Sequence, residues 1–174
     1  TAGFCMGVRK AMERTLAERS EAEGTLYTLG PLIHNPQVLE ILKKNGVLPV
    51  DTDDVQCGST VIIRAHGVAP EALEALRERG AVVINATCPK VGRIQGMAKK
   101  ASAEGKAVVI VGDRDHAEVQ GILGHARGAG VCVGSLSEAE ALQLDRPAIL
   151  LAQTTFNERE YETIAASLAR RFPG

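Results

Sequence analysis

The chain has 174 residues, of which 45% are apolar and 24% charged, with no tryptophan and a formal net charge of −1. This composition supports one large or two small domains with an aliphatic core, which is typical of buried parallel strands. A net charge so close to zero gives no reason to expect nucleic acid or an anionic membrane as a partner. No apolar run approaches the roughly 20 residues that span a bilayer, and no basic-then-apolar leader opens the sequence. We therefore expect no membrane partner and a cytoplasmic location.

Short apolar, β-branched runs alternate with helical patterns along the chain. The expected strands cover residues 25–29, 61–64, 81–84, 107–111, 130–133 and 148–151. The expected helices cover residues 7–20, 36–44, 70–79, 89–103, 116–123, 137–142 and 157–171. Three of these helices begin with proline and three end at glycine, as helix termini commonly do. The alternation predicts βαβ units with right-handed crossovers and parallel sheets.

The second half of the chain repeats the pattern of the first half. One series of units closes near residues 84–87, and a similar series of strands and helices follows it. No low-complexity linker separates the two series. We therefore predict an α/β fold with two similar small lobes, residues 1–84 and 85–174, each a parallel-type sheet flanked by helices.

Two of the four cysteines stand where a helix is expected to begin. Cys5 lies in GFCMG between glycines that let a bulky ligand approach the backbone, and Cys88 precedes proline in ATCP. Free N–H groups and the helix dipole at such positions favour a thiolate, which a metal or an iron–sulfur cluster requires. The structural alternative is a small buried hydrophobic residue. Cys57 in a polar loop and Cys132 in an expected strand are interpreted as loop and core residues, and no C-x-x-C spacing indicates a zinc ribbon.

Three of the four histidines fall at expected strand-to-helix junctions, namely His34, His66 and His116. Open α/β sheets gather ligands at the carboxyl ends of their strands. An imidazole beside a helix N-terminus suits a phosphate or diphosphate group. The structural alternative for each is a capping or hydrogen-bonding role, and His125, which follows its expected helix, is interpreted as structural.

Two further polar residues occupy similar junctions. Glu118 lies two residues after His116, where a carboxylate could relay protons through water or a hydroxyl group. An isolated glutamate there is more commonly an ordinary first-turn acid that the helix dipole favours. Thr154 could be a plain helix N-cap, a role for which its neighbour Thr155 competes.

Six ordered segments resemble the LytB/IspH family, the 4-hydroxy-3-methylbut-2-enyl diphosphate reductases of the non-mevalonate isoprenoid pathway. They are GFCMGV at 3–8, the His34-Asn35 turn, AHGV at 65–68, ATCP at 86–89, GDRDHAEVQG at 112–121 and AQTT at 152–155. The segments run through essentially the whole chain. Composition and spacing alone reach only an α/β protein with a thiol–imidazole site.

The resemblance implies a role for each matching residue. Cys5 and Cys88 match two of three cysteines that hold a 4Fe–4S cluster with one iron open to substrate. His34 and His66 match histidines that bind the diphosphate. His116 matches a histidine of the substrate pocket, near the hydroxyl and the diphosphate. Glu118 matches the acid that supplies protons, and Thr154 matches the hydroxyl that orients the substrate's OH group.

The reaction implied by the resemblance is a reductive dehydroxylation of 4-hydroxy-3-methylbut-2-enyl diphosphate. Two electrons enter through the cluster from a donor such as flavodoxin or ferredoxin, and water leaves. The products are isopentenyl and dimethylallyl diphosphate. An iron Lewis acid makes hydroxide a better leaving group, and a nearby carboxylic acid completes its departure as water.

One departure from the family pattern limits what these residues are expected to do. The family builds three similar lobes in a trefoil-like arrangement, and this chain matches the first two, so the third lobe and the third cysteine ligand are absent from it. We therefore expect an incomplete portion that holds no intact cluster and is inactive alone. The alternatives are a non-catalytic diphosphate-binding module and a zinc-binding α/β module that uses Cys5, Cys88 and a histidine.

Overall fold

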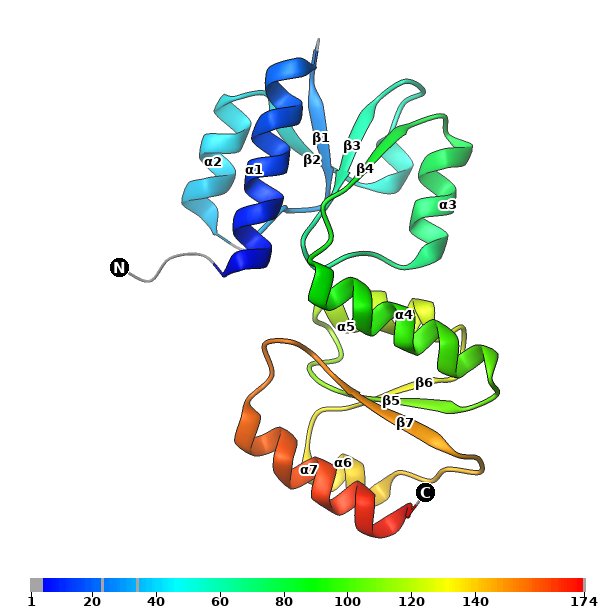
Figure 1. Cartoon of the computed structure of the whole chain (residues 1–174). Helices are drawn as coiled ribbons and strands as arrows, with labels where there is room; N and C mark the ends of the chain where they lie inside the picture. The colour runs from blue at the N-terminus through cyan, green and yellow to red at the C-terminus, as the bar shows by residue number, and fades with distance from the viewer. Residues whose placement is uncertain (1–4, 23, 34, 174) are drawn as a thin grey trace. The chain divides into compact units, whose positions relative to one another are not determined.

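The computed structural model describes residues 5–22, 24–33 and 35–173 (Figure 1). The chain divides into two compact units, Thr1–Gly92 and Arg93–Gly174. Each unit contains one sheet of parallel strands with helices on both faces, which confirms the expected α/β fold. The contacts divide the chain within α4 (Pro89–Ala103), whereas the lobe boundary expected after residue 84 stays a prediction.

The first unit is built on a sheet with the strand order β2-β1-β3-β4. All three neighbouring pairs are parallel, and Thr28 of β1 lies opposite Ile62 of β3. In chain order its elements are α1 (Met6–Glu21), β1 (Leu26–Leu29), α2 (Pro36–Lys44), β2 (Val47–Val50), η1 (Thr52–Asp54), β3 (Thr60–Ile63), α3 (Pro70–Glu78) and β4 (Val82–Asn85).

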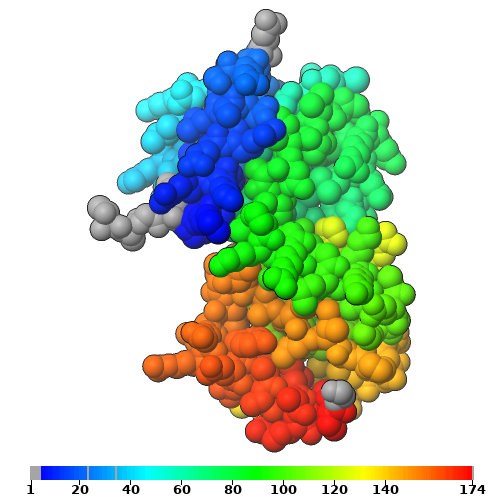
Figure 2. Space-filling view, viewed as in Figure 1, coloured from blue at the N-terminus to red at the C-terminus, as the bar shows by residue number. Residues whose placement is uncertain are grey.

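Alternate residues of this sheet supply two hydrophobic clusters on its opposite faces. On one face Leu26 and Ile62 pack with Ala11 of α1 and Leu42 of α2. Side chains of α1 (blue) and α2 (cyan) lie beside each other in Figure 2. The other cluster joins strand residues to α3, and its buried members are Leu29, Val55, Val61, Ile63, Val68 and Leu76. The period-2 pattern of the strands thus fixes which helix covers which face.

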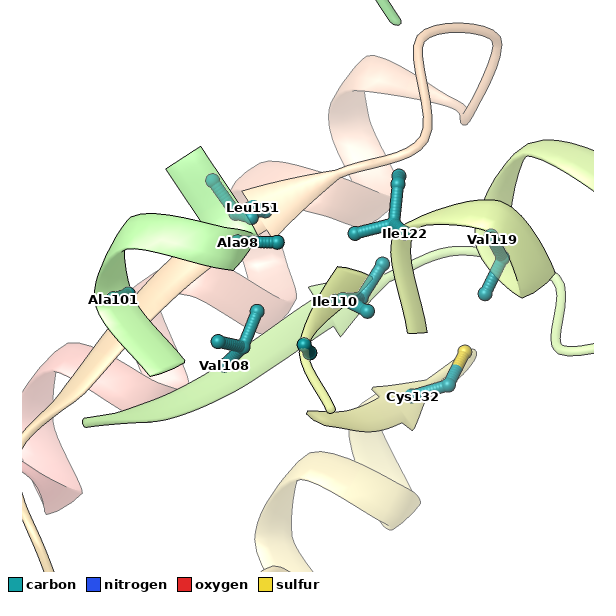
Figure 3. Close-up of a cluster of buried hydrophobic side chains, with 9 residues drawn as sticks. Ala98, Ala101, Val108, Ile110, Val119, Ile122, Cys132 and Leu151 are labelled. Atoms are coloured by element: carbon teal, nitrogen blue, oxygen red, sulfur yellow. The ribbon is translucent and has the colours of Figure 1, made fainter. Parts of the chain in front are cut away.

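The second unit repeats this plan around a sheet with the strand order β6-β5-β7. The aliphatic run of β5 is buried along its whole length, as expected for a central parallel strand. Figure 3 shows one of its two clusters, in which Ala98 of α4 and Ile122 of α5 pack on Ile110. In chain order the elements that follow α4 in this unit are β5 (Ala107–Val111), α5 (Ala117–His125), β6 (Gly130–Val133), α6 (Leu136–Ala141), β7 (Ala148–Ala152) and α7 (Glu158–Arg171).

Each sheet contains a point where successive crossovers leave in opposite directions. In the first unit this point lies between β1 and β3, since β1 connects to β2 through α2 and β3 connects to β4 through α3 on the other face. In the second unit it lies between β5 and β7, which lead to α5 and α7 on opposite faces. Open α/β sheets bind ligands beyond the carboxyl ends of strands at such switch points.

Strand β2, the short helix η1 and the end of α5 differ from what the sequence predicts, and the other element bounds agree within one residue. Strand β2 was not predicted because Pro49 interrupts its short apolar run, and proline is tolerated here because β2 is an edge strand. Helix α5 extends to His125, so this residue lies in the last helical turn and does not follow the helix. No helix in the described part of the chain is long and apolar enough to cross a membrane.

Candidate functional site

Cys5 begins helix α1 at the carboxyl-end side of the first sheet. It is the N-cap residue, with extended backbone angles (φ −60°, ψ 160°), and its carbonyl accepts the N–H of Arg9 at 3.0 Å. Its side chain is exposed and makes no capping hydrogen bond within the described residues. The thiol is therefore open to an external ligand at the positive end of a helix dipole.

Cys88 is held by backbone hydrogen bonds on both sides. Its N–H donates to the carbonyl of Ala65 at 2.8 Å, which extends the β3–β4 pairing past the ends of the strands. Its own carbonyl accepts the N–H of Gly92 at 2.9 Å, the first such bond of α4. The half-buried thiol is thus fixed by a strand end and a helix start together.

A glycine lets the Cys88 thiol lie against α1. A Cβ atom placed on Gly7 would stand 2.7 Å from Sγ and 2.9 Å from Cβ of Cys88. Real Cβ atoms do not approach so closely, so the sulfur occupies the space that a side chain at residue 7 would fill. Because Gly7 lies in the first turn of the helix that Cys5 begins, this contact places the Cys88 thiol against that turn.

His66 lies in the loop that anchors Cys88. A tight turn over residues 64–67 is closed by the Gly67 N–H, which donates to the Arg64 carbonyl at 3.0 Å, with Gly67 at φ +69°. The half-buried His66 is therefore one residue from the Ala65 carbonyl that holds Cys88. His34 lies outside the described residues, and its diphosphate-binding role stays a prediction.

The donor set at this edge fits part of an iron–sulfur site. Cys5 begins α1 and the Cys88 thiol packs against the first turn of that helix, and thiolates are the usual ligands of such clusters. Across the described ranges, no group of three or more His, Cys, Asp or Glu side chains is arranged to hold a metal ion. The roles of Cys5 and Cys88 as cluster ligands stay a prediction.

In the second unit, Glu118 is buried and hydrogen-bonded through both carboxylate oxygens. Its side chain is 0% exposed. The Thr154 N–H donates to Oε1 at 2.7 Å, and the Thr154 hydroxyl donates to Oε2 at 2.8 Å. These two residues follow β5 and β7, the strands on either side of the switch point. The structure thus joins two predicted site residues, and Glu118 lies in the first turn of α5, as its alternative reading expected, but is buried there.

His116 is the N-cap residue of α5. Its Nδ1 accepts the N–H of Glu118 at 3.2 Å, so the capping role considered for the junction histidines is the one that this imidazole takes. Since Nδ1 accepts, the neutral ring carries its proton on Nε2. His116, Glu118 and Thr154 therefore form one hydrogen-bonded cluster at the switch point of the second sheet.

Gln153 is a residue of this cluster that the sequence analysis did not single out. Its Oε1 accepts the Asp113 N–H at 2.9 Å, and its Nε2 donates to the Thr155 hydroxyl at 2.9 Å. A Cβ on Gly112 would lie 2.9 Å from the same Oε1 and 2.8 Å from Cγ2 of Val119. The sequence signal that could have pointed to this contact is Gly112, because a glycine directly after a buried strand commonly marks the close approach of another part of the chain.

The other two cysteines have the roles expected for them. Cys57 is exposed in a loop, and Cys132 is 2% exposed in β6 within the core of the second unit. The Cys132 thiol donates to the Gly112 carbonyl at 3.3 Å, and burial raises its pKa above the ordinary value. Neither thiol belongs to the site formed by Cys5 and Cys88.

Fold and site together define an α/β protein with two polar clusters at the carboxyl ends of its parallel strands, one rich in thiols and one built on a buried carboxylate. The family model described as LytB protein matches residues 1–174. The chain belongs to the LytB family.

Relatives and solved structures agree with this assignment. The 4-hydroxy-3-methylbut-2-enyl diphosphate reductase of Aquifex aeolicus is 44% identical over 172 residues, covering 97% of this chain and 59% of that protein. The reductase of Treponema denticola is 41% identical, with 97% of this chain and 63% of that protein covered.

A solved structure of (E)-4-hydroxy-3-methyl-but-2-enyl diphosphate reductase, the terminal enzyme of the non-mevalonate pathway, superposes with a TM-score of 0.87 at 42% identity. The superposition covers 98% of this chain and 62% of the chain in the solved structure. The structure of the reductase from Plasmodium falciparum gives a TM-score of 0.94 at 26% identity. This superposition covers 98% of this chain and 55% of the Plasmodium chain. The chain thus spans about three fifths of the length of the relatives that it matches.

Proposed function

We propose that this chain contributes to a 4-hydroxy-3-methylbut-2-enyl diphosphate reductase, an iron–sulfur oxidoreductase of isoprenoid biosynthesis. The observation that carries the proposal is the packing of the Cys88 thiol against the first turn of α1, the helix that Cys5 begins, where Gly7 leaves room for sulfur. The names of the relatives support the same activity.

In this proposal Cys5 and Cys88 are two ligands of a 4Fe–4S cluster. When bound, such a cluster supplies electrons and a Lewis-acidic iron for an allylic oxygen. His66 and His34 bind the diphosphate group of the substrate. The position of His66 beside the Cys88 anchor, at the ligand-binding edge of a parallel sheet, supports its part in this role.

The second unit supplies the proton chemistry. The allylic C–O bond breaks, the departing oxygen takes a proton and leaves as water, and two electrons and a second proton complete isopentenyl or dimethylallyl diphosphate. Glu118 supplies protons from its carboxyl group. The Thr154 hydroxyl, which already contacts Oε2 of Glu118, orients the substrate hydroxyl, and His116 lines the pocket. The electrons come from a donor such as flavodoxin or ferredoxin, and the reaction takes place in the cytoplasm.

The test measures metal and sulfide on the purified protein under anaerobic conditions. Native mass spectrometry reads polypeptide mass and bound iron and sulfide together. We expect no intact cluster on this chain alone. In a longer polypeptide that supplies the third cysteine we expect iron and sulfide in equal numbers, loss of both in Cys5→Ser and Cys88→Ser, and retention in the control Cys57→Ser. Cys57 is suited to this control because it is exposed and lies in a separate loop.

Three outcomes contradict the proposal. Iron and sulfide retained after Cys88→Ser would remove this residue from the ligand set. Zinc without sulfide, lost in the same two variants, would instead favour the zinc-binding module. A longer polypeptide that binds pyrophosphate but holds no iron would favour a non-catalytic diphosphate-binding module.

A further inference from the structure

Arg64 stands at the switch point of the first sheet. It directly follows β3, and the pairing of Thr28 with Ile62 places it opposite Gly30, which directly follows β1. A Cβ on Gly30 would lie 3.3 Å from Nη1 of Arg64, so the guanidinium lies across the end of the neighbouring strand. Gly30 has φ +65°, a conformation that disfavours any larger residue there.

The charge of Arg64 has no counterpart in the described part of the molecule. Its Nε is buried without a hydrogen-bond partner among residues 5–22, 24–33 and 35–173. None of the ion pairs formed by described residues includes it. Desolvation by burial lowers the pKa of the guanidinium, and no carboxylate counters this effect. A half-buried cation without a partner is costly for a folded protein unless something else satisfies it.

The surroundings of Arg64 indicate what satisfies it. The residue opens the turn over residues 64–67 that carries His66, and its carbonyl closes that turn by accepting the Gly67 N–H. Ligands bind beyond the carboxyl ends of the strands at a switch point, where this guanidinium lies. The planar fork of arginine matches the geometry of phosphate oxygens.

We propose that the Arg64 guanidinium is an anion-binding group that takes a phosphate oxygen of a phosphate or diphosphate ester at the switch point of the first sheet. The inference deepens the proposed function and rests on it for the choice of a diphosphate. It adds a cationic contact to the site at which His66 is expected to act.

Isothermal titration calorimetry with inorganic pyrophosphate and inorganic phosphate, at constant ionic strength, tests this proposal. We expect Arg64→Gln to bind pyrophosphate roughly 10- to 100-fold more weakly than the parent chain, as befits the loss of a charge-assisted hydrogen bond. Arg64→Lys should lose less, because the charge remains and only the fork geometry is lost. A stronger response to pyrophosphate than to phosphate would identify the diphosphate as the preferred source of the anion.

The matched control is Arg77→Gln, an exposed arginine in the last turn of α3. This variant should bind as the parent does. Thermal unfolding without ligand adds a second readout: Arg64→Gln should not lower the melting temperature, because it removes an unpartnered charge, whereas a structural arginine would lower it.

The possible failures are distinguishable. If the parent binds pyrophosphate and Arg64→Gln binds it equally well, the role of Arg64 is overturned and the proposed function stands. If the parent binds neither anion at millimolar concentration, the diphosphate site of the proposed function is overturned together with this inference. A fall in melting temperature with unchanged affinity would assign Arg64 to structure.

Discussion

The two sheets carry polar residues at the same kind of edge, yet the edges are satisfied differently. In the second unit Glu118 is buried and both of its oxygens accept hydrogen bonds from Thr154. In the first unit the Arg64 Nε is buried without a described partner, and the Cys5 thiol makes no capping bond within the described residues. The buried carboxylate at the second edge is thus hydrogen-bonded within this chain, whereas these polar groups at the first edge have no hydrogen-bond partner among the described residues.

The largest effect should come from removing the internal partner at the second edge. We expect Glu118→Ala to lower the free energy of unfolding by about 2–5 kcal/mol, because it leaves a cavity and strips two Thr154 donors of their acceptor. Glu118→Gln keeps one acceptor and the shape, so it should cost about 1 kcal/mol. Urea denaturation followed by circular dichroism measures both. Equal costs for the two variants would contradict the assigned hydrogen bonds.

A smaller effect should follow from filling the close approach at Gly112. A Cβ there would meet Val119 and Gln153 at 3.0 Å or less, so Gly112→Ala should cost about 1–3 kcal/mol. The matched control is Gly96→Ala in α4, where nothing lies within 4 Å of the added Cβ. That variant should gain up to about 1 kcal/mol from helix propensity. The same denaturation series checks both, and a stabilised Gly112→Ala would refute the packing described for this loop.

At the first edge, a double-mutant cycle isolates the contact between glycine and sulfur. Gly7→Ala should cost about 1 kcal/mol or more while Cys88 is present, since Sγ lies 2.7 Å from the new Cβ. In a Cys88→Gly background, which lacks both the sulfur and the Cβ of residue 88, the same change should be neutral or slightly stabilising. The coupling free energy between the two sites is expected within about 0.5–3 kcal/mol. Additive effects would show that the thiol does not occupy the space beside residue 7.

The mildest probe leaves the sequence unchanged. Alkylation of the native protein, followed by peptide mass spectrometry, should label exposed Cys5 and Cys57 first, half-buried Cys88 later and buried Cys132 last. Burial raises the pKa of Cys132, so its reactive thiolate is scarce at neutral pH and its labelling should increase only as the pH rises above the ordinary thiol range. Labelling of Cys132 at the rate of Cys57 would contradict the core assigned to β6.

Much of the fold could be predicted from local signals. The β-branched run of β5 and the helix-initiating Pro36, Pro70 and Pro89 mark their elements without tertiary information. Strand β2 was not predicted, because a proline is acceptable in a strand only at the edge of a sheet and the sequence does not show which strands are edges.

The arrangement of the site residues was harder to predict from the sequence, for a physical reason. Glu118 and Thr154 are 36 positions apart, and only the parallel pairing of β5 with β7 brings them together. The burial of Glu118 therefore could not be read from its own helix turn. Gln153 and Arg64 carry no motif in isolation, because their roles arise from what lies opposite them across a strand end.

The absence of a side chain at Gly7 has a consequence for how the sequence can evolve. Gly7 does not have the positive φ that would require glycine for conformational reasons. What excludes a side chain there is the Cβ and the sulfur of residue 88, on a different part of the chain. Only a descendant with glycine at position 88 would free residue 7 to vary, so the two positions are expected to change together although they are far apart in the sequence.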